Sequence, residues 1–115
     1  MQATNVVLFD TQYVPATETE MFASPDDGAG TIIDKFTTTN LDSVTRTILV
    51  RLVPAGETPT GVDFIVKSKQ LAAGQCYLWP EIAGQMLDAG GSIRMDCDAA
   101  DIVTTRASGR NLLED

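Results

Sequence analysis

Residues 44–53 spell VTRTILVRLV, a run in which β-branched side chains dominate. Val44, Ile48 and Val50 share one parity, the threonines fall on the other, and a few residues such as Arg46 break the alternation. An alternation with a period of two predicts a strand with one face buried and the other in water. A helix is disfavoured, because β-branched residues crowd a helix and the run lacks a spacing of three to four.

Shorter extended runs lie on both sides of this strand, separated by turn-forming residues. The segments 24–30 (SPDDGAG) and 54–61 (PAGETPTG) carry proline and glycine, which favour turns. Residues 81–87 are the single helical candidate, with two turns at most before Gly90. Further strands are predicted at residues 5–9, 18–23, 31–40, 62–69, 75–79, 92–98 and 101–108.

Alternation also assigns the sides of two of these strands. Apolar residues of one parity are expected to face the core, and charged residues of the other parity to face water. The predicted inward positions are Val62, Phe64 and Val66 in one strand, and Ile93, Met95 and Cys97 in the other.

The predicted fold is an all-β, single-domain antiparallel β-sandwich of about eight strands with one short helical turn. Strands roughly ten residues apart are typical of sandwiches and small barrels, and 115 residues suit one domain better than two. A jelly roll is preferred, with an immunoglobulin-like sandwich as the alternative. The domain covers residues 1–115, with 1–5 and 109–115 expected as extended arms or frayed ends.

Charge and composition disfavour several classes of function. Sixteen acidic and eight basic residues give a formal net charge of −8, and the bases are spread along the chain. Because such a surface repels phosphate, we expect no nucleic-acid partner. We also expect no membrane contact and no signal peptide, since apolar runs are short and the start lacks bases. Cys76 and Cys97 are then expected to be reduced, with a disulfide between them as the alternative.

The chain offers little for catalysis. It has no histidine, the commonest general base and a frequent metal ligand. We therefore predict no enzyme and no catalytic, cofactor-binding or metal-binding residue. A calcium site in residues 96–101 (DCDAAD) is less favoured, because the segment lacks the glycine and distal glutamate of an EF-hand loop. Glycosidases use a pair of carboxylates, and the candidates here are Glu18, Glu20, Asp26 and Asp27. This activity is disfavoured, because the few aromatic residues leave little for the aromatic-walled cleft that a glycosidase needs.

Two apolar groups are candidates for contact with another protein. Trp79 is predicted as a core plug or, alternatively, as an interface anchor beside Met86 and Leu87, because tryptophan and methionine are enriched at contact centres. Leu112 and Leu113 form an apolar pair near the C-terminus, of a kind that a neighbouring subunit often covers. These five residues are the predicted interface.

Six segments follow one another in a recurring order of strands and turns. They are FASP at 22–25 before a glycine turn, TIIDKFTTTN at 31–40, VRLVPAG at 50–56, LAAGQCY at 71–77, the block from Trp79 through Ile93, and TRASGR at 105–110. Together they resemble a class of small structural proteins of tailed bacteriophages, namely capsid decoration or cement proteins and head-tail or tail accessory subunits. The shared motifs are turns and strand pieces, so no catalytic residue carries over.

The resemblance implies a non-enzymatic virion protein, made in the host cytoplasm, that decorates and cements the outer capsid surface. Its partners would be the major capsid protein or other virion proteins, and further copies of itself in a dimer or trimer. One alternative is a tail, neck or baseplate accessory protein. An alternative of another class is a carbohydrate-binding β-sandwich, in which Trp79 and Tyr77 would form the aromatic platforms.

Overall fold

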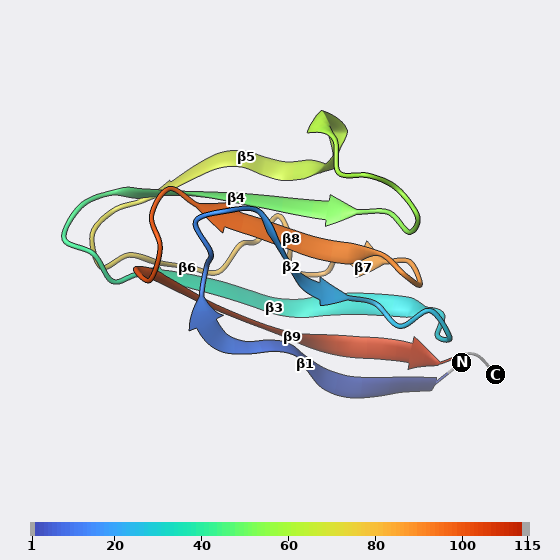
Figure 1. The fold of residues 1–115 in the computed structure, drawn as a ribbon. Coiled ribbons are helices and arrows are strands. Elements are labelled where there is room, and N and C mark those ends of the chain that lie inside the picture. Colours follow the sequence, from blue (N-terminus) through green and yellow to red (C-terminus); the bar gives the residue numbers. More distant parts are fainter. Residues whose placement is uncertain (1, 114–115) are drawn as a thin grey trace.

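Two antiparallel sheets pack face to face in the computed structural model, which describes residues 2–113 (Figure 1). Sheet A contains β1 (Gln2–Tyr13), β9 (Val103–Leu113), β3 (Gly30–Asn40) and, beyond β3, the short β6 (Cys76–Tyr77) and β7 (Met86–Leu87). Sheet B contains, in spatial order, β2 (Thr19–Ala23), β8 (Ser92–Cys97), β4 (Arg46–Val53) and β5 (Phe64–Leu71).

The connections between these strands are those of a jelly roll. The spatial orders are β1-β9-β3-β6 and β2-β8-β4-β5, and β7 pairs with the same edge of β3 as β6 does. If β6 and β7 count as one position, the chain has eight positions and crosses between sheets at every step except β4 to β5. Two interleaved Greek keys of this kind form a jelly roll. The predicted all-β sandwich is therefore confirmed.

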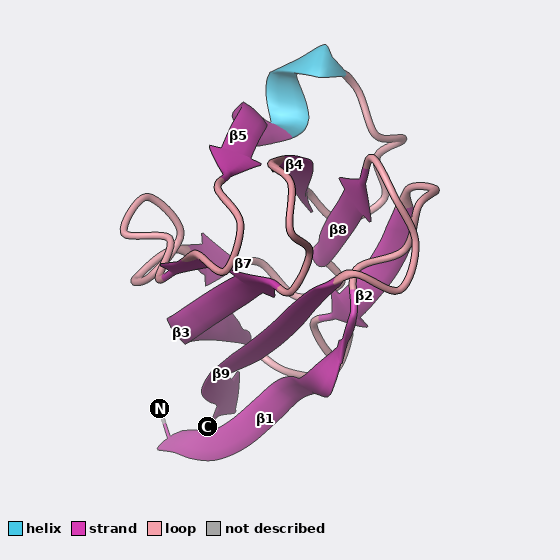
Figure 2. Cartoon of the chain, turned by 90° about the vertical axis from the view of Figure 1, so that its left-hand side faces the viewer, coloured by secondary structure: helices cyan, strands magenta, loops and turns pink. Residues whose placement is uncertain are grey.

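The two sheets face each other (Figure 2), and buried residues from both form one core cluster. In β3, Ile33 and Phe36 both face inward, three positions apart, because Asp34 is an extra residue where the register with β9 shifts. The ring of Phe36 meets Phe9 and Trp79 edge-on, with 5.7 Å between ring centroids in each pair. Such edge-to-face contacts add to the stabilisation from burial alone.

The predicted alternation holds in the middle of the central strands of sheet B, although Val44, which precedes β4 (Arg46–Val53), is 51% exposed and Val53 at the strand end is buried. Ile48 and Val50 of β4 are fully buried. The predicted inward residues of β8, Ile93, Met95 and Cys97, are at most 3% exposed. The two strands pair without a register shift from Ile48 opposite Cys97 to Val53 opposite Ser92. An unbroken register preserves the period of two, which is why alternation predicts these strands well.

In the edge strand β5, the predicted alternation is confirmed for Val66, which contacts the core, and is wrong for Val62 and Phe64. Val62 is 90% exposed on a short 3-10 helix, η1 (Gly61–Asp63), which precedes the strand. The register with β4 shifts twice, so β5 carries two extra residues, and both Ile65 and Val66 contact the core. Phe64 instead lies outside, opposite Arg51 of β4.

The predicted helix at residues 81–87 is reduced to one turn. The amides of Ile82 and Ala83 donate to the Trp79 carbonyl, each at 3.0 Å. The chain then leaves the turn, because Gly84 and Gln85 hydrogen-bond with the backbone of Ile33 in β3 at 2.6 and 2.9 Å. Gly84 has a φ of 93°, which favours glycine. Sheet pairing therefore replaces the expected helix.

The two chain ends pair with each other as sheet. Gln2 lies opposite Leu113, and the register is regular from there to Val7 opposite Ser108. The described parts of the expected arms, residues 2–5 and 109–113, thus belong to β1 and β9, while residues 1, 114 and 115 lie outside the described residues. Gly109 permits close pairing, since a Cβ there would lie 2.0 Å from the Ile32 carbonyl oxygen.

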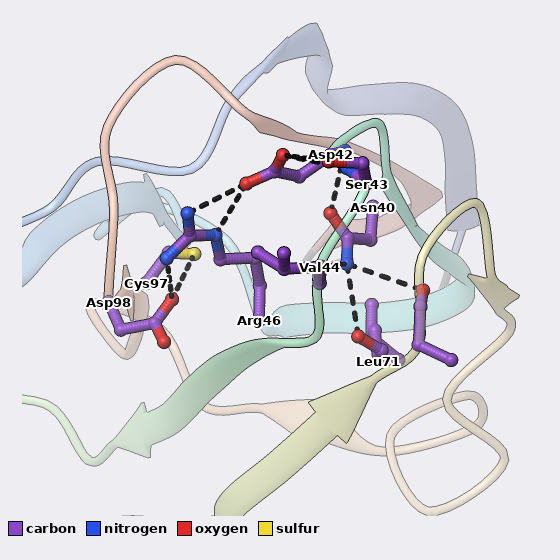
Figure 3. Close-up of polar contacts among 9 residues, drawn as sticks. Asn40, Asp42, Ser43, Val44, Arg46, Leu71, Cys97 and Asp98 are labelled. Carbon is purple, nitrogen blue, oxygen red and sulfur yellow. Dashed lines mark hydrogen bonds and ion pairs between the residues drawn. The ribbon is translucent and has the colours of Figure 1, made fainter.

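A buried asparagine fixes the corner where the chain passes from β3 to β4 (Figure 3). The Asn40 side chain donates to the carbonyls of Val44 at 2.9 Å and Leu71 at 3.0 Å, with Ala72 a little farther at 3.3 Å. Its Oδ1 accepts from the Asp42 amide at 2.9 Å. One side chain therefore ties the corner to the end of β5, which lies in the opposite sheet.

Candidate interaction surface

Two of the five predicted interface residues are core residues. Trp79 is fully buried, and its indole Nε1 donates to Thr38 Oγ1 at 2.8 Å. Leu87 is also buried, because it lies opposite Thr31 on the inward face of β3. The predicted interface role is wrong for these two residues, because neither side chain is accessible. For Trp79 the alternative prediction, a residue that fills the core, is confirmed.

Met86 and Leu112 come together on the outer face of sheet A, the face turned away from sheet B. Met86 lies opposite Ile32, and Leu112 lies opposite Gly30 on one side and Ala3 on the other. Directly opposed residues share a face of the sheet, so these five form one group, which we call the apolar end. The charged Arg110, opposite Ile32 on β9, borders this group. Met86 is 52% exposed, and Ile32 and Leu112 are half-buried.

Leu113 belongs to the other side of this end of the sheet. It follows Leu112 in a regular strand and is 40% exposed, so its side chain points to the opposite face. The structure thus joins Met86 with Leu112 and separates both from Leu113.

The other half of the outer face is polar. A shallow groove of about 260 Å³ crosses β9 there, lined mainly by hydroxyl groups and two cations. Arg106 lies 3.4 Å from Asp10, and the pKa of Asp10 is lowered by the Thr11 amide and by Arg106. The polar lining includes Thr11, Lys35, Thr37, Thr39, Thr104 and Arg106.

An ion pair divides the two halves. Arg110 of β9 donates two hydrogen bonds of 3.0 Å to the carboxylate of Asp34. A forked pair of this geometry is more specific than a single contact, and the carboxylate raises the pKa of Arg110 further. The pair keeps the bulged Asp34 directed outward over β9.

The outer face of sheet B is occupied by its own charges. Arg51 and Arg94 lie directly opposite each other, and Glu18 reaches between them, bonded to Arg51 and 3.5 Å from Arg94 Nε. The Arg51 guanidinium also covers the ring of Phe64 at 3.8 Å. Burial and the charge of Glu18 raise the pKa of the neighbouring Asp96. On this face the two arginines are therefore already paired with Glu18 and Phe64.

The acidic groups weighed for chemistry are scattered. Asp26 and Asp27 are exposed in the turn before β3, and Asp98 faces Arg46 at 3.9 Å (Figure 3). Among residues 2–113, no three histidine, cysteine or acidic side chains are positioned to share a metal ion.

The two cysteines lie in different sheets, and both are free thiols. Cys76 is exposed on β6, whereas Cys97 is buried on β8. Burial raises the pKa of the Cys97 thiol, which keeps it protonated at neutral pH. Both cysteines are thus reduced, as predicted.

No described helix is long and apolar enough to span a membrane.

Two exposed residues of β1 escaped prediction. Val7 is 50% exposed and Tyr13 is 48% exposed. Val7 belongs to a run of four apolar residues, VVLF at 6–9, which cannot all face inward in a strand, so the sequence held a signal for it. For Tyr13 the sequence gives no such signal, because residues 10–17 look like a loop around Pro15.

The outer face of sheet A, with its apolar end and its polar groove, is therefore the candidate interaction surface. Comparisons with protein-family models, with curated proteins and with solved structures each return no match to this chain.

Proposed function

We propose that this protein is a non-enzymatic structural protein of a tailed-phage virion, and that it decorates the outer capsid surface through the outer face of sheet A. The observation that carries the proposal is the apolar end of that face, where Met86 stands out beside Ile32 and Leu112. Exposed apolar groups that lie together mark contact sites more often than isolated ones do. The resemblance to phage decoration proteins supplies the partner.

The charge of the chain supports a protein partner. A net charge of −8 repels the packaged genome and keeps the free subunit soluble before it attaches. Many copies on a symmetric shell gain avidity, so each contact can be small. Association with further copies, as a dimer or trimer, adds to this effect.

The test is co-sedimentation of the purified protein with heads of the phage that encodes it. The wild-type chain is expected to saturate the heads and to raise their melting temperature. Met86→Glu places a charge in the apolar end and should weaken binding at least tenfold, since burying an unpaired charge is costly. Val62→Glu is the matched control, because Val62 is more exposed and lies on η1, beyond sheet B.

Equal binding by both variants would overturn the assignment of this face, and the absence of any binding to heads would overturn the capsid role. The same assay with purified tails tests the tail, neck or baseplate alternative. Saturation of tails but not of heads would favour that alternative.

One observation favours the carbohydrate-binding alternative. The groove over β9 offers hydroxyl groups beside Lys35 and Arg106, and Tyr13 lies opposite Thr104 at its end. Tyr13 replaces the predicted platforms, since Trp79 is buried and the half-buried Tyr77 is bonded to Glu81. A glycan array tests it: binding that Tyr13→Ala and Arg106→Ala abolish would support this function, and a blank array would dismiss it.

A further inference from the structure

β1 forms an open edge of sheet A. Within residues 2–113 it pairs only with β9, and it runs along the lower margin of the fold in Figure 1. Its other side therefore presents a row of backbone amides and carbonyls to solvent. Such a row is a template for pairing with another chain unless something blocks it.

The other edges of the sandwich are blocked. β5 carries Lys67 and Lys69 and two register shifts against β4. β2 has only five residues, with Glu20 next to a shift in register against β8. β6 and β7 have two residues each and are separated by a turn that contains Pro80. Lysines, bulges, short strands and prolines are the usual means of protecting sheet edges.

β1 lacks these protections in its first half, from Gln2 to Val7, whereas its second half carries Asp10 and two shifts in register against β9. It has 12 residues, and none from Gln2 to Phe9 is charged or proline. Its register with β9 is regular from Gln2 to Val7. A regular, neutral edge such as residues 2–7 is the kind that pairs.

We propose that a second copy of this chain pairs antiparallel with β1 along Ala3–Val7, across a two-fold axis, and joins the two A sheets into one. The neutral stretch suits this partner, because two subunits of charge −8 repel each other elsewhere on their surfaces. Pairing of a strand with its own copy satisfies the same backbone groups on both chains, as an isologous contact requires.

We place the axis so that the second copy covers the exposed Val7. Directly opposed residues in an antiparallel pair share a face. With the axis beside Asn5, Val7 lies opposite Ala3 of the second copy and Val6 lies opposite Thr4. This register covers Val7, one of the two large apolar side chains of β1 that are about half exposed.

Sedimentation equilibrium tests this pairing in solution, without any capsid. The wild-type mass should rise with concentration from 12.3 kDa toward twice that value. A single strand pair buries less than a standard interface, so the dimer should be weak and concentration-dependent. A mass that stays at 12.3 kDa into the millimolar range would overturn the proposal.

Charge substitutions at the axis locate the contact. Asn5→Lys and Asn5→Glu should each weaken the dimer at least tenfold, because two like charges would meet there, and an equimolar mixture should restore it. Ser68→Lys on β5, another exposed edge position, should leave the dimer unchanged. Dimers that resist both Asn5 variants, or that Ser68→Lys disrupts instead, would refute the β1 contact.

A measurement on the unmodified protein covers the case in which a variant does not fold. Amide hydrogen exchange should slow with concentration in residues 2–7 and should not change in β5. Slowing elsewhere alone would contradict the pairing. This pairing gives a structure to the self-association in the proposed function, but it does not depend on binding to a capsid. Dimers that form in solution but do not bind heads would therefore overturn only the capsid role.

Discussion

Replacement of Asn40 by alanine should be among the most damaging single changes in this fold. The side chain is fully buried, and it supplies two N–H donors to the Val44 and Leu71 carbonyls and one acceptor to the Asp42 amide. Three hydrogen bonds at about 1 kcal/mol each predict a loss of about 3 kcal/mol in the free energy of unfolding. For a domain of this size, that lowers the melting temperature by roughly 10 °C.

Urea denaturation followed by Trp79 fluorescence measures this loss, because Trp79 is the single tryptophan and is fully buried. A loss of about 3 kcal/mol shifts the midpoint by roughly 1 to 3 M urea. Asn5→Ala removes the same group from an exposed position and should change stability by less than about 0.5 kcal/mol. A loss below about 1 kcal/mol for Asn40→Ala would refute the role of the corner.

Two further predictions concern the sheets. Gly109→Ala should cost about 3 kcal/mol or more, because the new Cβ would lie 2.0 Å from the Ile32 carbonyl oxygen; Gly61→Ala, with open space around it, should be nearly neutral, and equal stability of the two variants in urea would contradict this reasoning. Asp96→Asn should stabilise the protein slightly at pH 7, by less than about 1 kcal/mol. Burial and Glu18 raise the pKa of Asp96, so the folded state loses stability as pH rises through the window between the unfolded and folded pKa values. The advantage of the variant should therefore shrink in melting curves recorded at progressively lower pH, and an advantage that grew on acidification would count against it.

The central strands could be predicted from sequence because their registers are unbroken. In β4 and β8, the buried residues alternate with a period of two through most of the paired length, as Ile48 and Val50 do in β4 and Ile93, Met95 and Cys97 do in β8. In β5, the two extra residues place Phe64 outside while Val66 still contacts the core, and Val62 is exposed because it lies on η1, before the strand. A bulge is decided by the partner strand, which a local pattern does not contain.

The ends and the site required the tertiary structure. Residues 109–113 look like a polar tail, and only pairing with β1 and β3 makes them a strand. Met86 and Leu112 are far apart in sequence, so their meeting beside Gly30 depends on the strand order. From sequence, Trp79 could be a core residue or an interface residue. Its burial and the hydrogen bond from its indole to Thr38 show that it is a core residue.

We propose that the outer face of sheet A binds the outer shell of a phage head. Electron cryomicroscopy of heads saturated with the purified chain tests it most directly. We expect density on the outer shell, with Met86 and Leu112 against the capsid protein and the charged face around Arg51 in solvent. Heads without added density, or subunits attached through the Arg51 face, would contradict it.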